Sequence, residues 1–330
     1  MLEPIVLDLS NFDGPNQLDF AKEVLEGFRR DGFIKIVGHG IPNSEIAQLL
    51  AWNKAFFDLP LKEKLSISNI EGPEPQRGYS AVGVEKTATL NLNGAVNLEM
   101  ASHDGREDAK ETFDMGGPED EEFPNQWPQE TSIPEFRKWI ERYWFKSHHV
   151  AMRVLNALEL ALGLPRDSFV SRCDGCKSEM CMNHYPSVPA EKLLGDKTMR
   201  IWPHTDASAI TLLAQDVAGG LEVENQSSPG TFEPVLRANA GELIVNGGET
   251  LERWTNGLLK PVLHQVNAPK ELNVQANGMV PARHSVAFFV NANADASMGP
   301  YDKFVPAGEP SKFPNMLSRD YHRLRNMVVY

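Results

Sequence analysis

Apolar residues recur at helical spacing along much of the chain. The spacing predicts helices over residues 17–30, 43–58 and 133–164, with a strand at Phe33–Val37 between the first two. The longest predicted helix carries apolar side chains at Phe136, Ile140, Trp144, Val150, Val154, Leu158 and Leu162. The sequence of the tail, from about residue 311 to residue 330, predicts a closing helix.

A different pattern begins near Met182. From there to Val290, short apolar runs alternate with turn residues, as in the strands of a double-sheet jelly roll. The predicted fold is therefore mixed α+β, with a double-stranded β-helix core, flanking helices and an N-terminal α/β extension. A roll of this kind suits a small-ligand cavity at its mouth. A length of 330 residues allows two domains, but β-barrel enzymes of this size often form one compact unit, which is the favoured interpretation.

Charge and composition narrow the class of protein. The chain has 32 basic and 45 acidic residues, a net charge of −13, which disfavours binding to nucleic acid or other polyanions. We find no apolar run of the roughly 18 residues that a membrane helix needs, and no signal-peptide pattern at Met1–Pro4. We therefore expect a cytoplasmic protein without membrane or nucleic-acid partners, as a monomer or weak homo-oligomer.

Candidate chemistry lies within the predicted roll. His204, Asp206 and His264 are the ligand types of a mononuclear non-haem iron site, which leaves coordination positions open for a co-substrate and oxygen. On a strand, residues two apart point to the same side, so His204 and Asp206 are expected to converge. An H-x-D pair alone is weak evidence for a metal site. Arg283 and Ser285, on one face of a later strand, add a clamp for a carboxylate.

Several motifs together resemble the 2-oxoglutarate and Fe(II) dependent dioxygenases of the isopenicillin-N-synthase-like group, nearly end to end. In the N-terminal part the resemblance is carried by Asp31–Pro42, Phe56–Lys64 and Arg77–Tyr79. In the second half it is carried by Asn183–Pro186, the H-x-D and distal His, Thr211–Asp216 and the Arg283–Phe289 strand. Within the group, the chain looks nearest to a fungal thymine-hydroxylase-like branch.

The resemblance implies roles for particular residues. His204, Asp206 and His264 would hold Fe(II). Arg283 and Ser285 would bind the distal carboxylate of 2-oxoglutarate. Tyr185 would add a hydrogen bond, and Asn183 would lie near the metal-binding end of the co-substrate. Oxygen would be the second co-substrate. Residues 1–130 would form an N-terminal extension and substrate entrance, and residues 131–330 the helix-supported catalytic roll.

The resemblance also implies oxidation of a C–H bond of a small molecule, by hydroxylation, desaturation or ring rearrangement, in secondary-metabolite biosynthesis. The substrate residues expected from position are Arg77, Tyr79, Phe113, Arg200, Trp202 and Asn291. A cationic wall at Arg200 would favour an acidic or phenolic substrate. Two alternatives stay open: an iron oxidase that does not use 2-oxoglutarate, and a non-catalytic small-molecule binding barrel.

Some features depart from the family pattern. Gln265 stands where an Arg commonly follows the distal His, and Glu249 stands where Asp is frequent. Residues Lys270–Pro281 form an apparent insertion, and Asn91–Arg106 are expected to form a mobile lid.

A zinc site from Cys173, Cys176, Cys181 and His184 is a competing interpretation of the cysteines. It is disfavoured because Cys181 and His184 point to opposite faces of their predicted strand. Reduced structural thiols are the favoured interpretation.

Overall fold

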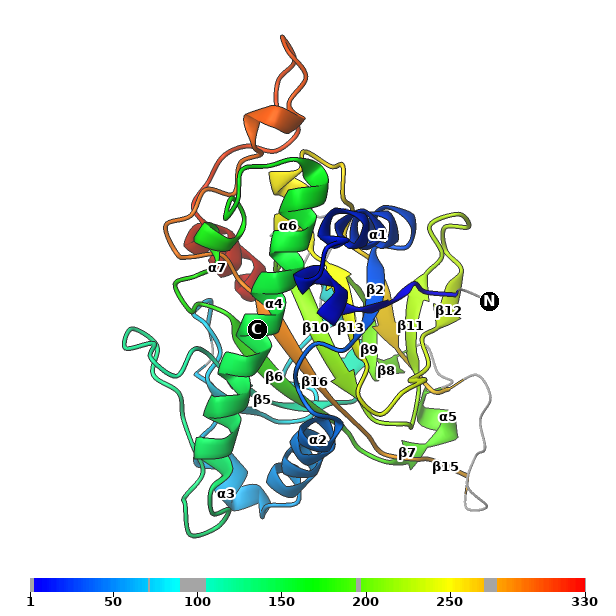
Figure 1. Ribbon diagram of the computed structural model, residues 1–330. Helices are drawn as coiled ribbons and strands as arrows, with labels where there is room; N and C mark the ends of the chain where they lie inside the picture. Colours follow the sequence, from blue (N-terminus) through cyan, green and yellow to red (C-terminus); the bar gives the residue numbers. More distant parts are fainter. Residues whose placement is uncertain (1–2, 71, 90–104, 194–196, 270–277, 330) are drawn as a thin grey trace.

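The computed structural model describes residues 3–70, 72–89, 105–193, 197–269 and 278–329. Two β-sheets line opposite sides of a cavity, and helices cover the outside of the larger sheet (Figure 1). The larger sheet has eight strands in the order β1-β2-β13-β10-β16-β6-β5-β3, and the smaller has four in the order β12-β11-β14-β9. This is the predicted mixed α+β fold with a double-stranded β-helix core.

The strands of the larger sheet are β1 (Val6–Asp8), β2 (Phe33–Val37), β3 (Gly78–Ser80), β5 (Glu111–Met115), β6 (Glu179–Tyr185), β10 (Ile210–Gln215), β13 (Leu243–Gly247) and β16 (Arg283–Val290). Those of the smaller sheet are β9 (Ile201–His204), β11 (Leu221–Glu224), β12 (Phe232–Pro234) and β14 (His264–Val266). Two short pairs flank them: β4 (Glu107–Asp108) with β8 (Thr198–Met199), and β7 (Val188–Pro189) with β15 (Met279–Val280).

The α-helices are α1 (Gln17–Arg30), α2 (Asn43–Phe57), α3 (Leu61–Leu65), α4 (Phe136–Leu162), α5 (Ala190–Leu193), α6 (Glu249–Trp254) and α7 (Ser318–Val329). Short 3-10 helices are η1 (Leu9–Asp13), η2 (Thr87–Thr89), η4 (Val170–Arg172) and η5 (Asp302–Phe304). The helices and the strand expected from apolar spacing in the first half, the long helix and the closing helix are therefore all present.

Strand register decides which side chains of the larger sheet face the cavity. Side chains alternate between faces along a strand, so directly paired residues form rows across the sheet. One row runs through Ile244, Leu213, Ala287, Cys181 and Asp114. A second runs through Asn246, Thr211, Phe289 and Glu179. Every member of both rows lines the cavity, so the sheet positions distant sequence segments side by side.

The opposite face of the larger sheet packs against α4. This long helix crosses the outside of the sheet in Figure 1 and contacts β10 and β16. Trp144 is fully buried there, with its ring centroid 5.4 Å from that of Phe288. The helix ends at Leu162. Gly163 follows with a positive φ of 62°, which lets the N–H of Leu164 turn back to the carbonyl of Glu159 at 2.9 Å, as expected for a glycine C-cap.

The apolar core extends across the expected boundary at residue 130. One cluster of buried side chains contains residues from Leu7 to Ala292. The division into residues 1–130 and 131–330 stays a prediction. The expected lid at Asn91–Arg106 and the insertion at Lys270–Pro281 lie largely outside the described residues.

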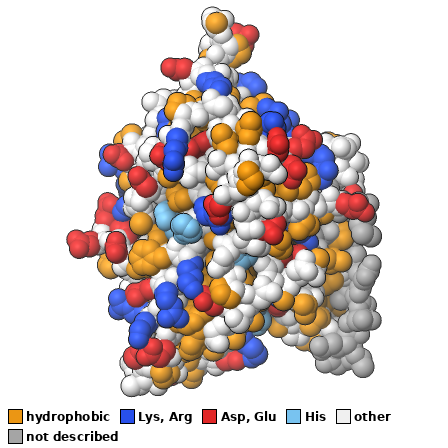
Figure 2. Space-filling view, viewed as in Figure 1, with side chains coloured by type: hydrophobic (Ala, Val, Ile, Leu, Met, Phe, Trp, Pro, Cys, Tyr) orange, Lys and Arg blue, Asp and Glu red, His pale blue; other side chains and the backbone are white. Residues whose placement is uncertain are grey.

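Acidic and basic side chains are interspersed with apolar ones on the molecular face shown in Figure 2. None of the helices in the described ranges is both long and apolar enough to cross a membrane.

A buried amide connects α2 to the cavity strands. Asn53 is fully buried, and its Nδ2 donates to the carbonyls of Ser285 (2.9 Å) and Asn183 (3.3 Å). Its Oδ1 lies 3.0 Å from Nδ1 of His284. The two Nδ2 bonds tie the helix to β6 and β16 at Asn183 and Ser285, whose side chains line the cavity.

Asn53→Ala should lower the free energy of unfolding by about 2 kcal/mol, because it leaves buried polar partners without a hydrogen bond. Gln48→Ala, an exposed change on the same helix, should alter it by no more than about 0.5 kcal/mol. Urea unfolding followed by fluorescence measures both, and equal losses would contradict a special role for Asn53.

Candidate active site

The ligand atoms of His204, Asp206 and His264 converge at one end of the cavity. They lie within 4.8 Å of one another, and of the described residues only this group is arranged so that it can hold a metal ion. Asp206 Oδ1 is 3.8 Å from Nε2 of His204 and 3.7 Å from Nε2 of His264. The three side chains come from three places in the fold: the end of β9, the loop after it, and β14.

Hydrogen bonds set the tautomers of both imidazoles. Nδ1 of His204 lies 2.9 Å from the carbonyl of Trp202, and Nδ1 of His264 lies 3.1 Å from that of Val262. Each Nδ1 therefore carries the proton, and each Nε2 directs a lone pair toward the other ligands. Burial, and then His264, lower the pKa of His204. A neutral ring is the form that binds a metal, so the donor set fits Fe(II).

The two histidines are adjacent because β9 pairs with β14, with His204 directly opposite His264. The expectation that Asp206 continues the strand is wrong, since β9 ends at His204. The chain instead turns after the strand, and the carbonyl of Asp206 accepts a hydrogen bond from the N–H of Glu249 at 2.8 Å. Convergence of the carboxylate is thus set by this turn and not by strand alternation.

Two polar residues of the larger sheet orient the carboxylate. Thr211 Oγ1 donates to Asp206 Oδ2 at 2.6 Å, and Asn246 Nδ2 donates to the same oxygen at 2.8 Å. Oδ1 remains directed toward the imidazoles. Sequence reasoning assigned no role to Thr211 or Asn246. The available signal was their position: each is a polar residue in an apolar strand.

A second cluster links the closing helix to the metal end. Glu249 Oε1 accepts from Thr205 Oγ1 at 2.5 Å and pairs with Arg325 at 3.1 Å, while Tyr321 donates to Oε2. Arg325 also donates to the carbonyl of Thr205 at 3.0 Å. Glu249, noted above as a departure from the family pattern, therefore connects α7 to the residue between two of the candidate ligands.

Farther along the cavity lies an arginine suited to an anion. Arg283 is only 1% exposed. It donates to Ser285 Oγ at 3.0 Å and to Gln215 Oε1 at 2.9 Å, while its Nε has no partner among the described residues. Its guanidinium carbon lies 4.8 Å from the ring centre of Tyr185. A buried cation whose hydrogen-bond partners are neutral and that has an unused N–H fits a carboxylate ligand.

The cavity between these groups has a volume of about 230 Å³. Its lining includes all three candidate ligands together with Arg283, Ser285, Tyr185 and Asn183. All six expected substrate residues are described in the structure, and of these six Asn291 alone lines the cavity.

The other five expected substrate residues lie behind the cavity wall or beside it. Tyr79 and Phe113 belong to the apolar core. Trp202 packs on Arg106 and donates to the carbonyl of Glu107. Arg200 is fully buried and donates to the carbonyl of Pro281, and burial, followed by the nearby Arg283, lowers its pKa to about 10.

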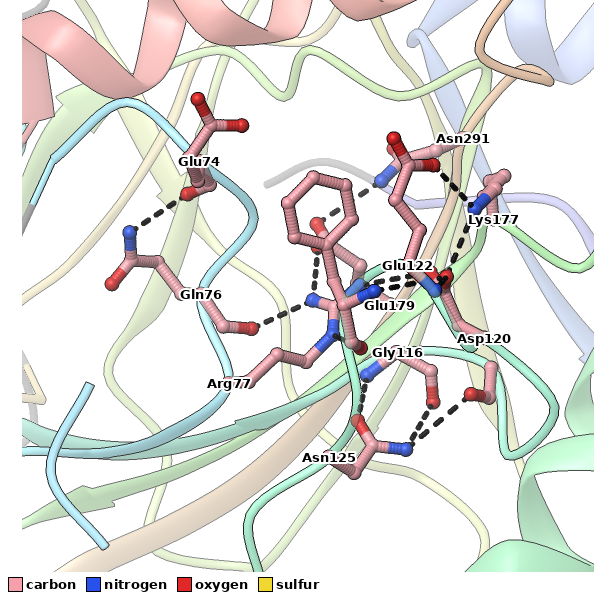
Figure 3. A network of polar contacts seen from close by, with 12 residues as sticks. Glu74, Gln76, Arg77, Gly116, Asp120, Glu122, Asn125, Lys177, Glu179 and Asn291 are labelled. Atoms are coloured by element: carbon pink, nitrogen blue, oxygen red, sulfur yellow. Dashed lines mark hydrogen bonds and ion pairs between the residues drawn. The ribbon is translucent and has the colours of Figure 1, made fainter. Parts of the chain in front are cut away.

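Arg77 lies in a polar network next to the cavity (Figure 3). It pairs with Glu179 at 2.6 Å and with Asp120 at 3.6 Å. Lys177 joins the network through Asp120 at 3.0 Å, and Asn291 donates to Glu179 at 3.1 Å. Arg77 is thus occupied by carboxylates, and Asn291 connects this network to the cavity.

Among the described residues, the cysteines and His184 of the competing zinc interpretation do not form a group that could hold a metal ion. Cys173 and Cys181 are buried free thiols, and Cys176 is a partly exposed one. On the face of β6 away from the cavity, His184 binds Glu111 at 2.7 Å and stacks on His284. These contacts explain both histidines structurally.

Comparison with known proteins identifies the family. The chain matches the model of the non-haem dioxygenase N-terminal region over residues 5–130, and that of the 2OG-Fe(II) oxygenase superfamily over residues 176–292. A 2-oxoglutarate-dependent dioxygenase of Aspergillus rugulosus, ecdK, is 44% identical, with 99% of each chain covered. The chain belongs to the 2-oxoglutarate- and Fe(II)-dependent dioxygenases.

Two further relatives are associated with particular compounds. The proline hydroxylase buaE of Petromyces alliaceus is 37% identical, with 98% of each chain covered. A full-length thymine hydroxylase of Neurospora crassa, solved in complex with alpha-KG and thymine, is 28% identical, with a TM-score of 0.86 and coverage of 99% of this chain and 97% of that one. The predicted family, its likeness to a fungal thymine hydroxylase, and the use of Fe(II), 2-oxoglutarate and O2 are confirmed. The dioxygenase oxidises a C–H bond of a small molecule.

Asn246→Ala should weaken Fe(II) binding by roughly 10- to 100-fold, because a hydrogen-bond partner of the Asp206 carboxylate is lost. Asn11→Ala, an exposed change near the N-terminus and far in sequence from the candidate ligands, should leave Fe(II) binding unchanged. Anaerobic titration with Fe(II), read by calorimetry, measures the dissociation constants. Equal affinities in the two variants would remove Asn246 from the metal site.

Proposed function

We propose that His204, Asp206 and His264 bind Fe(II) in this dioxygenase, and that Arg283 and Ser285 bind the distal carboxylate of 2-oxoglutarate. The observation that carries the proposal is one cavity with convergent Nε2 and carboxylate lone pairs at one place and a buried, incompletely bonded guanidinium at another. Tyr185 and Asn183 line the space between them and complete the co-substrate site.

The bound iron supplies the activation of O2, which couples conversion of 2-oxoglutarate to succinate and CO2 with oxidation of a C–H bond. The protein residues provide orientation. Thr211 and Asn246 hold the Asp206 carboxylate, and the Val262 and Trp202 carbonyls hold the rings. Apolar side chains on the small-sheet side of the cavity, Ile201, Leu221, Val223 and Val266, exclude water from the metal end.

The substrate is a small molecule of fungal secondary metabolism in this proposal. Proline and thymine, the compounds associated with two relatives, are the first to test. We include Asn291 among the substrate residues in this proposal, which its position in the cavity lining supports. The acidic net charge supports a small diffusible substrate over a polyanion. Action in the cytosol, by a monomer or weak homo-oligomer, is part of this proposal. The buried, incompletely bonded Arg283 argues against an oxidase that works without 2-oxoglutarate.

Anaerobic addition of Fe(II) and then 2-oxoglutarate should produce the weak visible charge-transfer band of the metal chelate. His264→Ala should abolish the band and succinate formation, because one of the three ligands is removed. His149→Ala, an exposed histidine on α4, is the matched control and should retain both. A band that survives in His264→Ala would refute the ligand assignment.

Arg283→Ala should raise the KM for 2-oxoglutarate by about 100-fold, since two charge-assisted hydrogen bonds contribute about 3 kcal/mol. The control is Arg166→Ala, whose side chain is 88% exposed. Succinate formation at varied 2-oxoglutarate concentration measures the KM. An unchanged KM would assign the carboxylate to another residue.

A further inference from the structure

One wall of the cavity carries acidic residues that the co-substrate site does not use. Glu85, Lys110 and Asp114 all line the cavity that contains the candidate metal ligands. Asp114 belongs to the row of paired residues that crosses the larger sheet through Ala287 and Cys181. The acidic wall therefore lies on the same sheet face as Arg283 and Ser285, displaced toward β5.

The hydrogen bonds of this wall leave the carboxylate of Asp114 short of donors. Lys110 pairs with Glu85 Oε2 at 2.6 Å. Thr112 Oγ1 lies 2.5 Å from Glu85 Oε1 and 2.9 Å from Asp114 Oδ2. A hydroxyl has one proton to donate, so it cannot serve both carboxylates, and the thiol of Cys181 beside Asp114 is a weak donor. Burial and the charge of Glu85 raise the pKa of Asp114 to about 7, as expected for a carboxylate short of positive charge.

A separate acceptor faces the same cavity from another segment. Gln76 is 7% exposed and lines the cavity. Its Nε2 donates to the carbonyls of Glu74 (3.0 Å) and Gly72 (3.3 Å), which defines the orientation of the amide. Its buried Oε1 has no hydrogen-bond partner within the described ranges. A buried acceptor without a donor indicates a ligand that brings one.

The nearby cations of the described chain are already engaged. Arg77 pairs with Glu179, and Arg325 pairs with Glu249. The cavity wall around Asp114 thus offers acceptors and negative charge, in contrast to the guanidinium of Arg283 at the co-substrate end.

We propose that the substrate of this dioxygenase presents a protonated primary or secondary amine to this wall, with Asp114 as its ion-pair partner and Gln76 as a further acceptor. Lys110 neutralises Glu85, so Asp114 is the carboxylate available to the substrate and sets specificity. This inference rests on the proposed function above, because it concerns the substrate of the same site. A bound metal ion fits less well, since the described residues of this wall do not form a cluster of metal-ligand geometry.

The test uses amines paired with their uncharged derivatives. L-proline, L-leucine and cyclohexylamine are each compared with the N-acetyl form, and thymine serves as a neutral heterocycle. The first readout is succinate formation by the enzyme with Fe(II), 2-oxoglutarate and O2. The second is the melting temperature of protein loaded with Mn(II) and 2-oxoglutarate, which reports binding without turnover. The chelate band is recorded beforehand for every variant.

At least one amine should stimulate succinate formation and raise the melting temperature, while its N-acetyl form does neither. Asp114→Asn should raise the KM for that amine by about tenfold or more, because a charge-assisted hydrogen bond is lost. This variant should fold at least as well as the wild type, since it removes a buried charge beside Glu85. Glu309→Gln, an exposed change of the same kind, should leave the KM unchanged.

Equal stimulation by the N-acetyl forms, preference for thymine, or no response to any amine while the chelate band forms would each overturn the proposal. An unchanged KM in Asp114→Asn would also overturn it. Absence of the chelate band in the wild-type enzyme would instead refute the proposed function, so the two failures are distinguishable.

Discussion

The convergence of Asp206 with the two imidazoles of His204 and His264 is the constraint on which the rest of the structure depends. Their lone pairs point toward one another within 4.8 Å, an arrangement that stabilises a bound cation. Holding it requires contributions from both sheets. The β9–β14 pairing places His204 opposite His264, whereas Thr211 and Asn246 of the larger sheet hold the carboxylate. Closure of the two sheets on each other is therefore what assembles the site. The fully buried Trp144 of α4 and the amide of Asn53 on α2 support the larger sheet from its outer face.

The cavity places opposite charges at different positions along one sheet face. Arg283 provides a buried guanidinium, the proposed partner of the distal carboxylate of 2-oxoglutarate. Asp114 provides a carboxylate two strands away, the proposed partner of the substrate amine. Each is costly to bury without a partner, so binding of the two ligands stabilises the fold. The same separation of charge distinguishes the two ligands, because neither would be attracted to the position of the other. The preorganised polarity of the cavity thus provides orientation and selectivity together.

Local patterns predicted the elements well, and the reasons for the failures are specific. The α4 periodicity and the strand at Phe33–Val37 depend on residues close in sequence, so spacing alone reveals them. Asp206 was expected on a strand with His204, but the strand ends at His204. The chain then turns, and a hydrogen bond from the N–H of Glu249 to the carbonyl of Asp206 sets the direction of the carboxylate. Among the expected substrate residues, Asn291 reaches the cavity wall, while Phe113 points into the core and Arg77 is held by Glu179. Sequence position could not decide among them, because neighbouring residues on a strand face opposite ways.

The sequence by itself determined the fold class and predicted the types of ligand and the carboxylate clamp, because these follow from residue chemistry and from periods of two or 3.6 residues. The tertiary structure alone decided which polar residues share the cavity. Asp114, Cys181 and Ala287 become neighbours only through the register of β5, β6 and β16. Register depends on packing between segments far apart in the chain, and shifting a strand by one residue would reverse its faces. The charge of the substrate wall is therefore a property of strand pairing, which no local pattern records.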